Sequence, residues 1–141
     1  MRNVKFRGKI VQMTLPNGEE LLGDFAFGNL LTHSCGVCRI LTPIYGGLEN
    51  RQISPNTIGQ YTGLTDRNGV EIYEGDILLV QQSIVQFEAV VAWNEATAAF
   101  GLIIGGKGKV HNDTLGEWLK DAECKVIGNI YDDPHYFRRD D

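Results

Sequence analysis

The chain has 141 residues and a net charge of −5, which arises from 18 acidic and 13 basic side chains. Apolar residues make up 43% and charged residues 22% of it, a balance that is typical of a globular domain and excludes an intrinsically disordered protein. No apolar run approaches the roughly 20 residues that a membrane-spanning helix needs, and the first ten residues lack the apolar core of a signal peptide. We therefore expect a cytoplasmic protein with no membrane partner.

The first half of the chain predicts β-strands joined by turns. Seventeen glycines and few helix-period stretches favour a β-rich fold, because glycine destabilises a helix. Residues 5–11 alternate for part of their length and predict a strand, and Pro16-Asn17-Gly18 predicts a turn before a partner strand over 19–27. A third strand is expected over 37–44, and segments 28–36 and 46–54 are expected to be loose connections.

The middle of the chain is dense in turn signals. Ser54 and Pro55 predict one helical turn, with Ser54 as the N-cap and Pro55 at the first helical position. Asp66-Arg67-Asn68-Gly69 predicts a type I turn between two short strands, and a type I′ hairpin at Asn68-Gly69 is the alternative. Glu74-Gly75-Asp76 predicts a second turn that leads into a strand over 77–80.

The last third predicts three more strands and a short helix. Residues 84–93 and 97–104 alternate between apolar and other side chains, and 124–130 predicts the closing strand. Thr114 and Glu117 have the spacing of a capping box and predict a short helix at 114–119. We expect one shared core for the apolar residues of these strands, namely Phe87, Val91, Trp93, Phe100, Leu102, Val126 and Ile130.

The segment QYTGLTDRNGVEIYEGDI resembles the signature of the YopX family of phage and prophage proteins, in which such a motif precedes a small β-barrel. The matching residues are Gln60, Tyr61, Thr62, Gly63, Leu64, Asp66, Asn68, Gly69, Ile72, Tyr73, Glu74, Gly75 and Asp76. Residues 5–9 (KFRGK) and 126–131 (VIGNIY) are also similar to the family's opening and closing segments. Leu21 departs from the pattern, because the family usually has an aromatic residue there.

The resemblance implies a mainly β protein with three parts. Residues 1–58 would form an N-terminal β-rich extension and candidate oligomerisation element, residues 59–131 an SH3-like barrel that contains the motif, and residues 132–141 a polar tail. The family has no established activity that could be transferred. The motif residues themselves read as structural, because their glycines, turn-forming carboxylates and packing aromatics all suit a turn-rich barrel wall.

The stretch THSCGVC raises the question of a metal or redox site, because Cys35 and Cys38 form a C-x₂-C pair beside His33. A structural zinc ion needs four ligands, and a redox pair is usually placed at a helix N-terminus. His33 is too close to Cys35 for ordinary zinc-knuckle geometry, and the residues after Cys38 predict a strand. We favour a turn followed by a strand, with reduced thiols and no zinc, over a metal site or a redox pair.

For the other candidate site residues, a structural role is favoured over a functional one. Four motif carboxylates, Asp66, Glu71, Glu74 and Asp76, could bind a hard cation, but turn capping explains Asp66 and Asp76 more simply. Trp93 and Trp118 are expected to anchor the core. Phe6, Tyr61 and Tyr73 could stack on bases, and a nucleic acid could contact the basic residues Arg2, Lys5, Arg7 and Lys9.

Three classes of function follow, in order of preference. The first is a non-enzymatic phage or prophage accessory protein that binds a phage or host protein and associates with itself, without a cofactor or catalytic residues. A homo-oligomer is favoured because the N-terminal strands contain more apolar residues than one isolated hairpin can bury. The alternatives are a small nucleic-acid-binding β-barrel and, least favoured, a metal-dependent enzyme built on the motif carboxylates.

Overall fold

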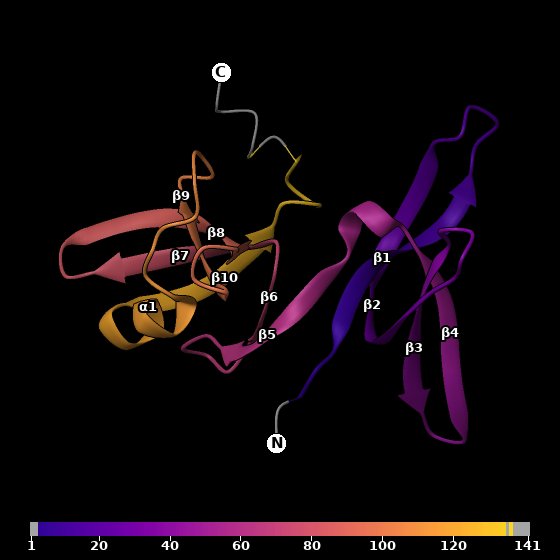
Figure 1. Cartoon of the computed structure of the whole chain (residues 1–141), viewed down its shortest axis with the longest axis horizontal. Helices are drawn as coiled ribbons and strands as arrows, with labels where there is room; N and C mark the ends of the chain where they lie inside the picture. Colours follow the sequence, from indigo (N-terminus) through magenta and orange to yellow (C-terminus); the bar gives the residue numbers. More distant parts are fainter. Residues whose placement is uncertain (1–2, 135, 137–141) are drawn as a thin grey trace. The chain divides into compact units, whose positions relative to one another are not determined.

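The computed structural model describes residues 3–134 and 136, which divide after Tyr61 into two compact units (Figure 1). Within the described residues there are ten β-strands, one α-helix and one short 3₁₀ helix. The strand ladders are antiparallel. The predicted mainly β fold is therefore confirmed.

The N-terminal unit is built from two long hairpins. Its strands are β1 (Phe6–Thr14), β2 (Glu20–Thr32), β3 (Cys38–Ile44) and β4 (Gly47–Ile53). Each strand pairs with the next, and the bridge between Ile10 and Ile53 brings β4 back to β1. In Figure 1 the β1–β2 and β3–β4 hairpins run to opposite ends of this unit.

Strand β2 can serve both hairpins because it bends at Gly28. It pairs with β1 up to Gly28 and with β3 from Asn29 onward. Gly28 has φ +153°, and a Cβ atom there would lie 2.2 Å from the carbonyl oxygen of Leu41, so only glycine fits. The buried core beside the bend consists of Ala26, Cys38, Ile40 and Ile53.

The predicted strands of this unit are confirmed, but two predicted connections are wrong. Most of segment 28–36 is the end of β2, and most of segment 46–54 is β4. The sequence of β4 has little local preference for a strand, and pairing with β3 along its whole length stabilises the extended conformation. The 3₁₀ helix η1 (Pro55–Thr57) is where the helical turn was predicted, but the Ser54 side chain makes no cap bond.

The second unit follows from β5 (Gly59–Thr65), whose first residues pair with β1. Its other elements are β6 (Glu71–Tyr73), β7 (Asp76–Gln82), β8 (Val85–Asn94), β9 (Ala99–Ile104), α1 (Leu115–Asp121) and β10 (Glu123–Asn129). Four of them form an antiparallel sheet in the order β10-β7-β8-β9. The predicted capping box of α1 is confirmed, since Thr114 and Glu117 bond reciprocally.

Strand β8 begins and ends one residue later than predicted, and β9 begins two residues later than predicted. Ile84 lies in the β7–β8 turn, where it is 99% exposed and follows Ser83 at φ +57°. Thr97 and Ala98 belong to the turn before β9, and Ala98 has φ +50°. A residue with positive φ interrupts a strand, and the alternation of apolar and polar residues does not predict where such a residue lies. No helix within residues 3–134 is long and apolar enough to cross a membrane.

The main core of the second unit contains five of the seven predicted core residues, namely Phe87, Val91, Phe100, Leu102 and Val126. Trp118, at the centre of α1, is also buried there, as predicted. The prediction for Trp93 is wrong: it lies near the end of β8, is 41% exposed, and contacts the Phe100 ring at 5.1 Å.

Ile130 is the second exception. A bulge between Val126 and Gly128 shifts the alternation of β10 by one residue, so that Ile130 joins a separate cluster. This cluster is formed by Ile77, Val90 and Tyr136. Tyr136 is therefore buried, although it lies in the expected polar tail.

Candidate functional site

The motif residues occupy two successive turns and the strands beside them. Gln60 and Tyr61 lie in β5 within the N-terminal unit, where Tyr61 N–H donates to the Lys5 carbonyl at 2.9 Å. Thr62, Gly63 and Leu64 continue β5 into the second unit, and Thr62 Oγ1 donates to the Ile72 carbonyl at 2.8 Å. The motif thus covers the chain segment that passes from one unit to the other.

The first turn is organised by the carboxylate of Asp66, which is 6% exposed. Its Oδ1 accepts the backbone N–H groups of Asn68 at 2.8 Å and Val70 at 2.9 Å. Gly69 N–H donates to the Asp66 carbonyl at 3.0 Å and Gly69 has φ +80°, whereas Asn68 is not among the residues with positive φ. This geometry is the predicted type I turn and excludes the type I′ alternative, which needs positive φ at both central residues.

The other oxygen of Asp66 reaches a strand that lies sixty residues further along the chain. Its Oδ2 accepts the Val126 N–H of β10 at 2.9 Å. Burial by itself raises the pKa of Asp66, but the three backbone N–H donors, helped by the Arg67 charge, outweigh it and hold the pKa below its ordinary value. The charged form is therefore the form that fits this site.

Arg67 adds two more links to β10. Its N–H donates to the Cys124 carbonyl at 3.2 Å, and its guanidinium pairs with the exposed carboxylate of Glu123 at 2.6 Å. With the bond from Val126 to Asp66, these contacts place the turn along the side of β10 that does not pair with β7. The first half of the motif therefore covers a strand edge that would otherwise be open.

The second turn is held by Asp76 and Gly75. Asp76 is 2% exposed, and its Oδ2 accepts the Tyr73 N–H at 2.8 Å. Gly75 N–H donates to the Val91 carbonyl at 2.9 Å, and the Gly75 carbonyl accepts the Ile130 N–H at 3.0 Å. Gly75 has φ +93°, and a Cβ there would lie 2.9 Å from the Tyr131 ring. Glycine is therefore required twice over, by its dihedral angle and by space.

The motif carboxylates are occupied by bonds within the fold. Asp66 and Asp76 accept backbone N–H groups, and Glu71 accepts the Tyr73 hydroxyl at 3.4 Å. Glu74 lies in the second turn and is partly buried. Across residues 3–134 and 136, no three His, Cys, Asp or Glu side chains gather in a group that could hold a metal ion.

THSCGVC forms the turn of the β2–β3 hairpin and the start of β3, as we predicted. His33 N–H donates to the Val37 carbonyl at 2.8 Å, and Gly36, at φ +93°, donates to the His33 carbonyl at 2.9 Å. Cys35 is exposed at the apex of this turn, whereas Cys38 is buried in the core of the N-terminal unit. The two thiols therefore lie in different surroundings, one in solvent and one among apolar side chains.

The basic N-terminal residues are not an exposed phosphate-binding patch. Arg7 and Lys9 are 5% and 7% exposed, and their cationic groups lie 4.2 and 4.3 Å from the centre of the Phe25 ring. Lys5 lies over the Tyr61 ring at 5.2 Å, and Arg2 is outside the described residues. Backbone contacts to nucleic acid need exposed cations, so this burial disfavours the nucleic-acid alternative.

The aromatic residues considered for base stacking are also largely occupied. Tyr73 is 2% exposed, which makes that role wrong for it, and Phe6 packs against the core of the N-terminal unit. Tyr61 is half-buried beneath Lys5. These rings stabilise the fold through packing and cation–π contact.

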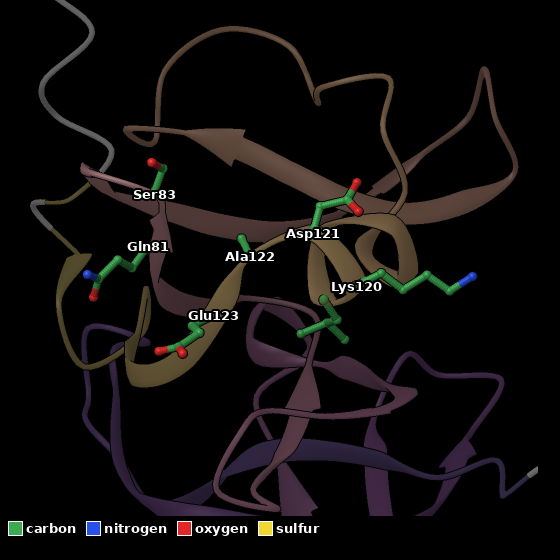
Figure 2. A pocket seen from close by; sticks show the side chains of 7 residues that line it. Gln81, Ser83, Lys120, Asp121, Ala122 and Glu123 are labelled. Atoms are coloured by element: carbon green, nitrogen blue, oxygen red, sulfur yellow. The ribbon is translucent and has the colours of Figure 1, made fainter.

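A hollow of about 490 Å³ lies beside α1 in the second unit (Figure 2). Gln81 and Ser83 line it from β7 and the following turn, and residues 119–123 line it from the end of α1 and the start of β10. The Lys120 side chain extends away from Gln81 and Glu123 in Figure 2. The lining is polar, mixed in charge and open to solvent, and none of its seven residues is a histidine or cysteine.

Together these features define a class: a mainly β protein of two units, in which a turn-rich motif links the units in sequence and covers a strand edge. The model of the family described as YopX protein matches residues 34–137, so the chain belongs to the YopX family, as the motif predicted. No curated protein matches the chain.

A solved structure with a similar fold is the crystal structure of protein EF1440 from Enterococcus faecalis. The likeness has a TM-score of 0.51 and 22% sequence identity, and it covers 97% of this chain and 99% of that chain. At this identity the comparison establishes a shared fold. Because the cover is nearly complete on both sides, both units take part in the match.

Sequence reasoning missed two features that bear on function. The first is β4, which carries Glu49 and Arg51 with an asparagine between them. The second is the reach of Asp66 to β10. Alternation of charged residues after Gly46-Gly47 could have indicated a strand, but no local signal reports a bond between residues 66 and 126.

Proposed function

We propose that this protein is a non-enzymatic accessory protein of phage or prophage origin, present in the host cytoplasm, that acts by binding other protein chains, including copies of itself. The chain belongs to the YopX family, and the resemblance of its motif to phage and prophage proteins of that family supports a phage or prophage origin. The motif supports a structural role, because both oxygens of Asp66 and one oxygen of Asp76 accept backbone N–H groups that hold turns in place.

One observation carries the association part of the proposal. Among its described residues, the N-terminal unit has a core cluster of only four buried apolar residues, yet it exposes nine large apolar side chains. These are Val4, Met13, Leu21, Leu22, Phe27, Leu31, Ile44, Tyr45 and Leu48. Tyr45, at the tip of the β3–β4 hairpin, has full exposure, and exposed aromatic and aliphatic clusters mark protein interfaces.

The second unit is the more complete of the two, and we infer that it is a variant of the SH3-like barrel. Its sheet is extended beyond the four main strands by the motif turn on β10 and by a bridge between Gly101 and Thr114 beside β9. An experimental structure decides this by showing whether β6 and the motif turn close the sheet.

The proposal is tested by determining the mass of the purified chain and by recovering its partners. Sedimentation velocity from about 1 to 100 μM should show a species heavier than the 15.7 kDa chain. Affinity capture from induced host cells, with cross-linking before lysis, should recover a defined phage or host protein. A pure monomer over the whole range, with no protein enriched over an untagged control, contradicts the proposal.

A further inference from the structure

We propose that two copies of this chain associate through their β3–β4 hairpins, with Tyr45 of each copy inserted into a hollow of the N-terminal unit of the other copy. This inference rests on the proposed self-association and assigns it a surface and an anchoring side chain. It follows from the exposure of Tyr45, the lining of the hollow, and the distance between the two along the hairpin.

Tyr45 stands clear of the rest of its unit. Ile44 pairs with Gly47, so Tyr45 and Gly46 form the turn of the β3–β4 hairpin. Tyr45 is 105% exposed and makes no hydrogen bond or ring contact with any described residue. Ile44 and Leu48 beside it are 48% and 62% exposed. An aromatic side chain between two exposed aliphatic ones gains free energy when a partner covers it.

A hollow of about 180 Å³ lies on the same unit. It is lined by Phe25, Ala26 and Phe27 of β2, by Thr42 of β3, and by Glu49 and Arg51 of β4. The lining is apolar on the β2 side and polar on the hairpin side, which suits a tyrosine, because its ring is apolar and its hydroxyl needs a hydrogen-bond partner. Arg51 pairs with Oε2 of Glu49, so Oε1 of the same carboxylate is placed to accept that hydroxyl.

The spacing of the two features suits a reciprocal exchange. Thr42 and Glu49 lie opposite each other, three residues from Tyr45 along β3, or about 10 Å at the rise of a strand. The full exposure of Tyr45 shows that its ring does not enter its own hollow. Two hairpins laid face to face and antiparallel bring each Tyr45 over the hollow of the other copy. The two-fold axis then passes near Ile44, which shares a face of β3 with Thr42.

The area of this contact is that of a small, reversible interface. A tyrosine buries about 150–250 Å², and two rings with the two hollows that receive them account for roughly 600–1,000 Å² in total. Ile44 and Leu48 of both copies extend the contact toward the lower bound of specific interfaces, about 1,200 Å². We therefore expect a dimer with a dissociation constant in the micromolar range.

Charge also favours this surface. Residues 62–141 contain 14 acidic and 7 basic side chains, a net charge of −7, whereas residues 1–61 contain 4 acidic and 6 basic ones, a net charge of +2. Two copies that met through their second units would bring like charges together. Residues 42–48 contain no charged side chain, and Glu49 and Arg51 at the hollow balance each other, so the hairpins approach without repulsion.

The first experiment removes the inserted side chain. Sedimentation equilibrium of Tyr45→Ala should give a dissociation constant raised by about thirtyfold or more, as expected for an aromatic anchor of an interface. Tyr45→Phe keeps the ring and should raise the constant by only about threefold to tenfold. Ile84→Ala is the matched control, because Ile84 is 99% exposed at a hairpin turn of the second unit, and it should leave the constant unchanged.

The second experiment blocks the hollow and tests reciprocity. Glu49→Trp fills the hollow while keeping Tyr45, and alone it should weaken association as Tyr45→Ala does. A dimer of one Glu49→Trp copy and one Tyr45→Ala copy retains one intact tyrosine facing one intact hollow, which neither variant retains alone. An equimolar mixture should therefore associate more tightly than either variant, with a constant between theirs and that of wild type.

Each result decides the inference. Circular dichroism should show every variant folded. If wild type forms a dimer and Tyr45→Ala or Glu49→Trp leaves its constant unchanged, the hairpin interface is wrong while self-association stands. If both variants weaken association but their mixture recovers nothing, the reciprocal insertion is wrong. If wild type is a monomer at 100 μM, this inference and the proposed self-association both fail.

Discussion

Two seven-residue strands of this protein, β10 and β4, each pair with one sheet neighbour along their full length, and their second sides are covered in different ways. The family motif lies along β10, where Arg67 N–H bonds Cys124 and Asp66 accepts from Val126. The corresponding side of β4 meets β1, through the bridge between Ile10 and Ile53. The second unit thus covers its strand with a turn and a carboxylate, whereas the N-terminal unit covers β4 with another strand.

The difference lies in the groups that cover each edge. The β10 edge meets the Asp66 carboxylate, which accepts the Val126 N–H of β10 and two N–H groups of its own turn, and so removes a template for strand addition. The end of β4 meets the backbone of β1, and Ser54 N–H, just beyond β4, donates to the Lys9 carbonyl at 2.9 Å. We therefore expect substitutions of the motif turn to lower the stability of the second unit.

The largest expected effect is on Asp66. Asp66→Ala leaves the N–H groups of Asn68, Val70 and Val126 without the carboxylate that accepts them, and we expect a loss of roughly 3 kcal/mol in unfolding free energy. Asp66→Asn should lose about half as much, because it keeps one acceptor oxygen. Urea unfolding measures both. Asp121→Ala, an exposed aspartate in α1, is the control, and equal losses at Asp66 and Asp121 would contradict a covering role.

The next effect concerns the turn itself. Gly69 has φ +80° with open space around its α-carbon, so Gly69→Val is limited by backbone strain alone. We expect a loss of more than about 1 kcal/mol, since a β-branched residue resists positive φ. Gly128→Ala in β10 is the matched control, because Gly128 lacks positive φ and has nothing within 4 Å of a new Cβ. A fully stable Gly69→Val protein that lost only partner binding would instead make the motif a functional surface.

A smaller effect is the pH dependence of the covered edge. The folded-state pKa of Asp66 lies below the value of about 3.8 expected in the unfolded chain. The carboxylate therefore contributes its full stability above about pH 4, and this contribution is lost as the pH falls through the folded-state pKa. The stability gap between wild type and Asp66→Asn should be widest near pH 7 and narrow below pH 4. A gap that stays constant to pH 3 would show that the charge of Asp66 is not what holds the turn on β10.

The smallest effect on the fold, and the easiest to measure, is thiol reactivity. Cys124 lies on β10 and is 1% exposed, and burial, followed by the nearby Asp66 charge, raises the pKa of its thiol. Cys35 is exposed at a turn of the N-terminal unit. We expect one of the three cysteines to react rapidly with Ellman's reagent and the other two only on unfolding. Cys35→Ser should abolish the rapid phase, and rapid reaction of Cys124 would show that the edge of β10 opens readily.

The same cysteines allow the zinc prediction to be checked. We expect metal analysis of protein purified without chelator to give far less than one equivalent of zinc. One buried and one exposed thiol, with no third ligand gathered beside them among the described residues, are a poor zinc site. A stoichiometric zinc signal that disappears in Cys35→Ser/Cys38→Ser would overturn this prediction.

Sequence alone determined the features that depend on a few neighbouring residues. The type I turn at Asp66–Gly69, the capping box at Thr114 and the turn at THSCGVC were all predicted, because the dihedral preferences and short side-chain bonds that define them lie within four or five residues. The family was also recognisable, since its motif is made of such turns.

Tertiary structure decided which surfaces are covered. The burial of Arg7, the exposure of Trp93 and the displacement of Ile130 to another cluster depend on where strands bend, end or bulge. Strand β4 formed where a loose connection was expected, because backbone pairing with β3 stabilises a segment whose own sequence has little preference for a strand. The bridge from β4 to β1 at Ile53 and the covered edge at Val126 are both consequences of long-range pairing, and the free energy of such pairing is set by contacts that no local pattern contains.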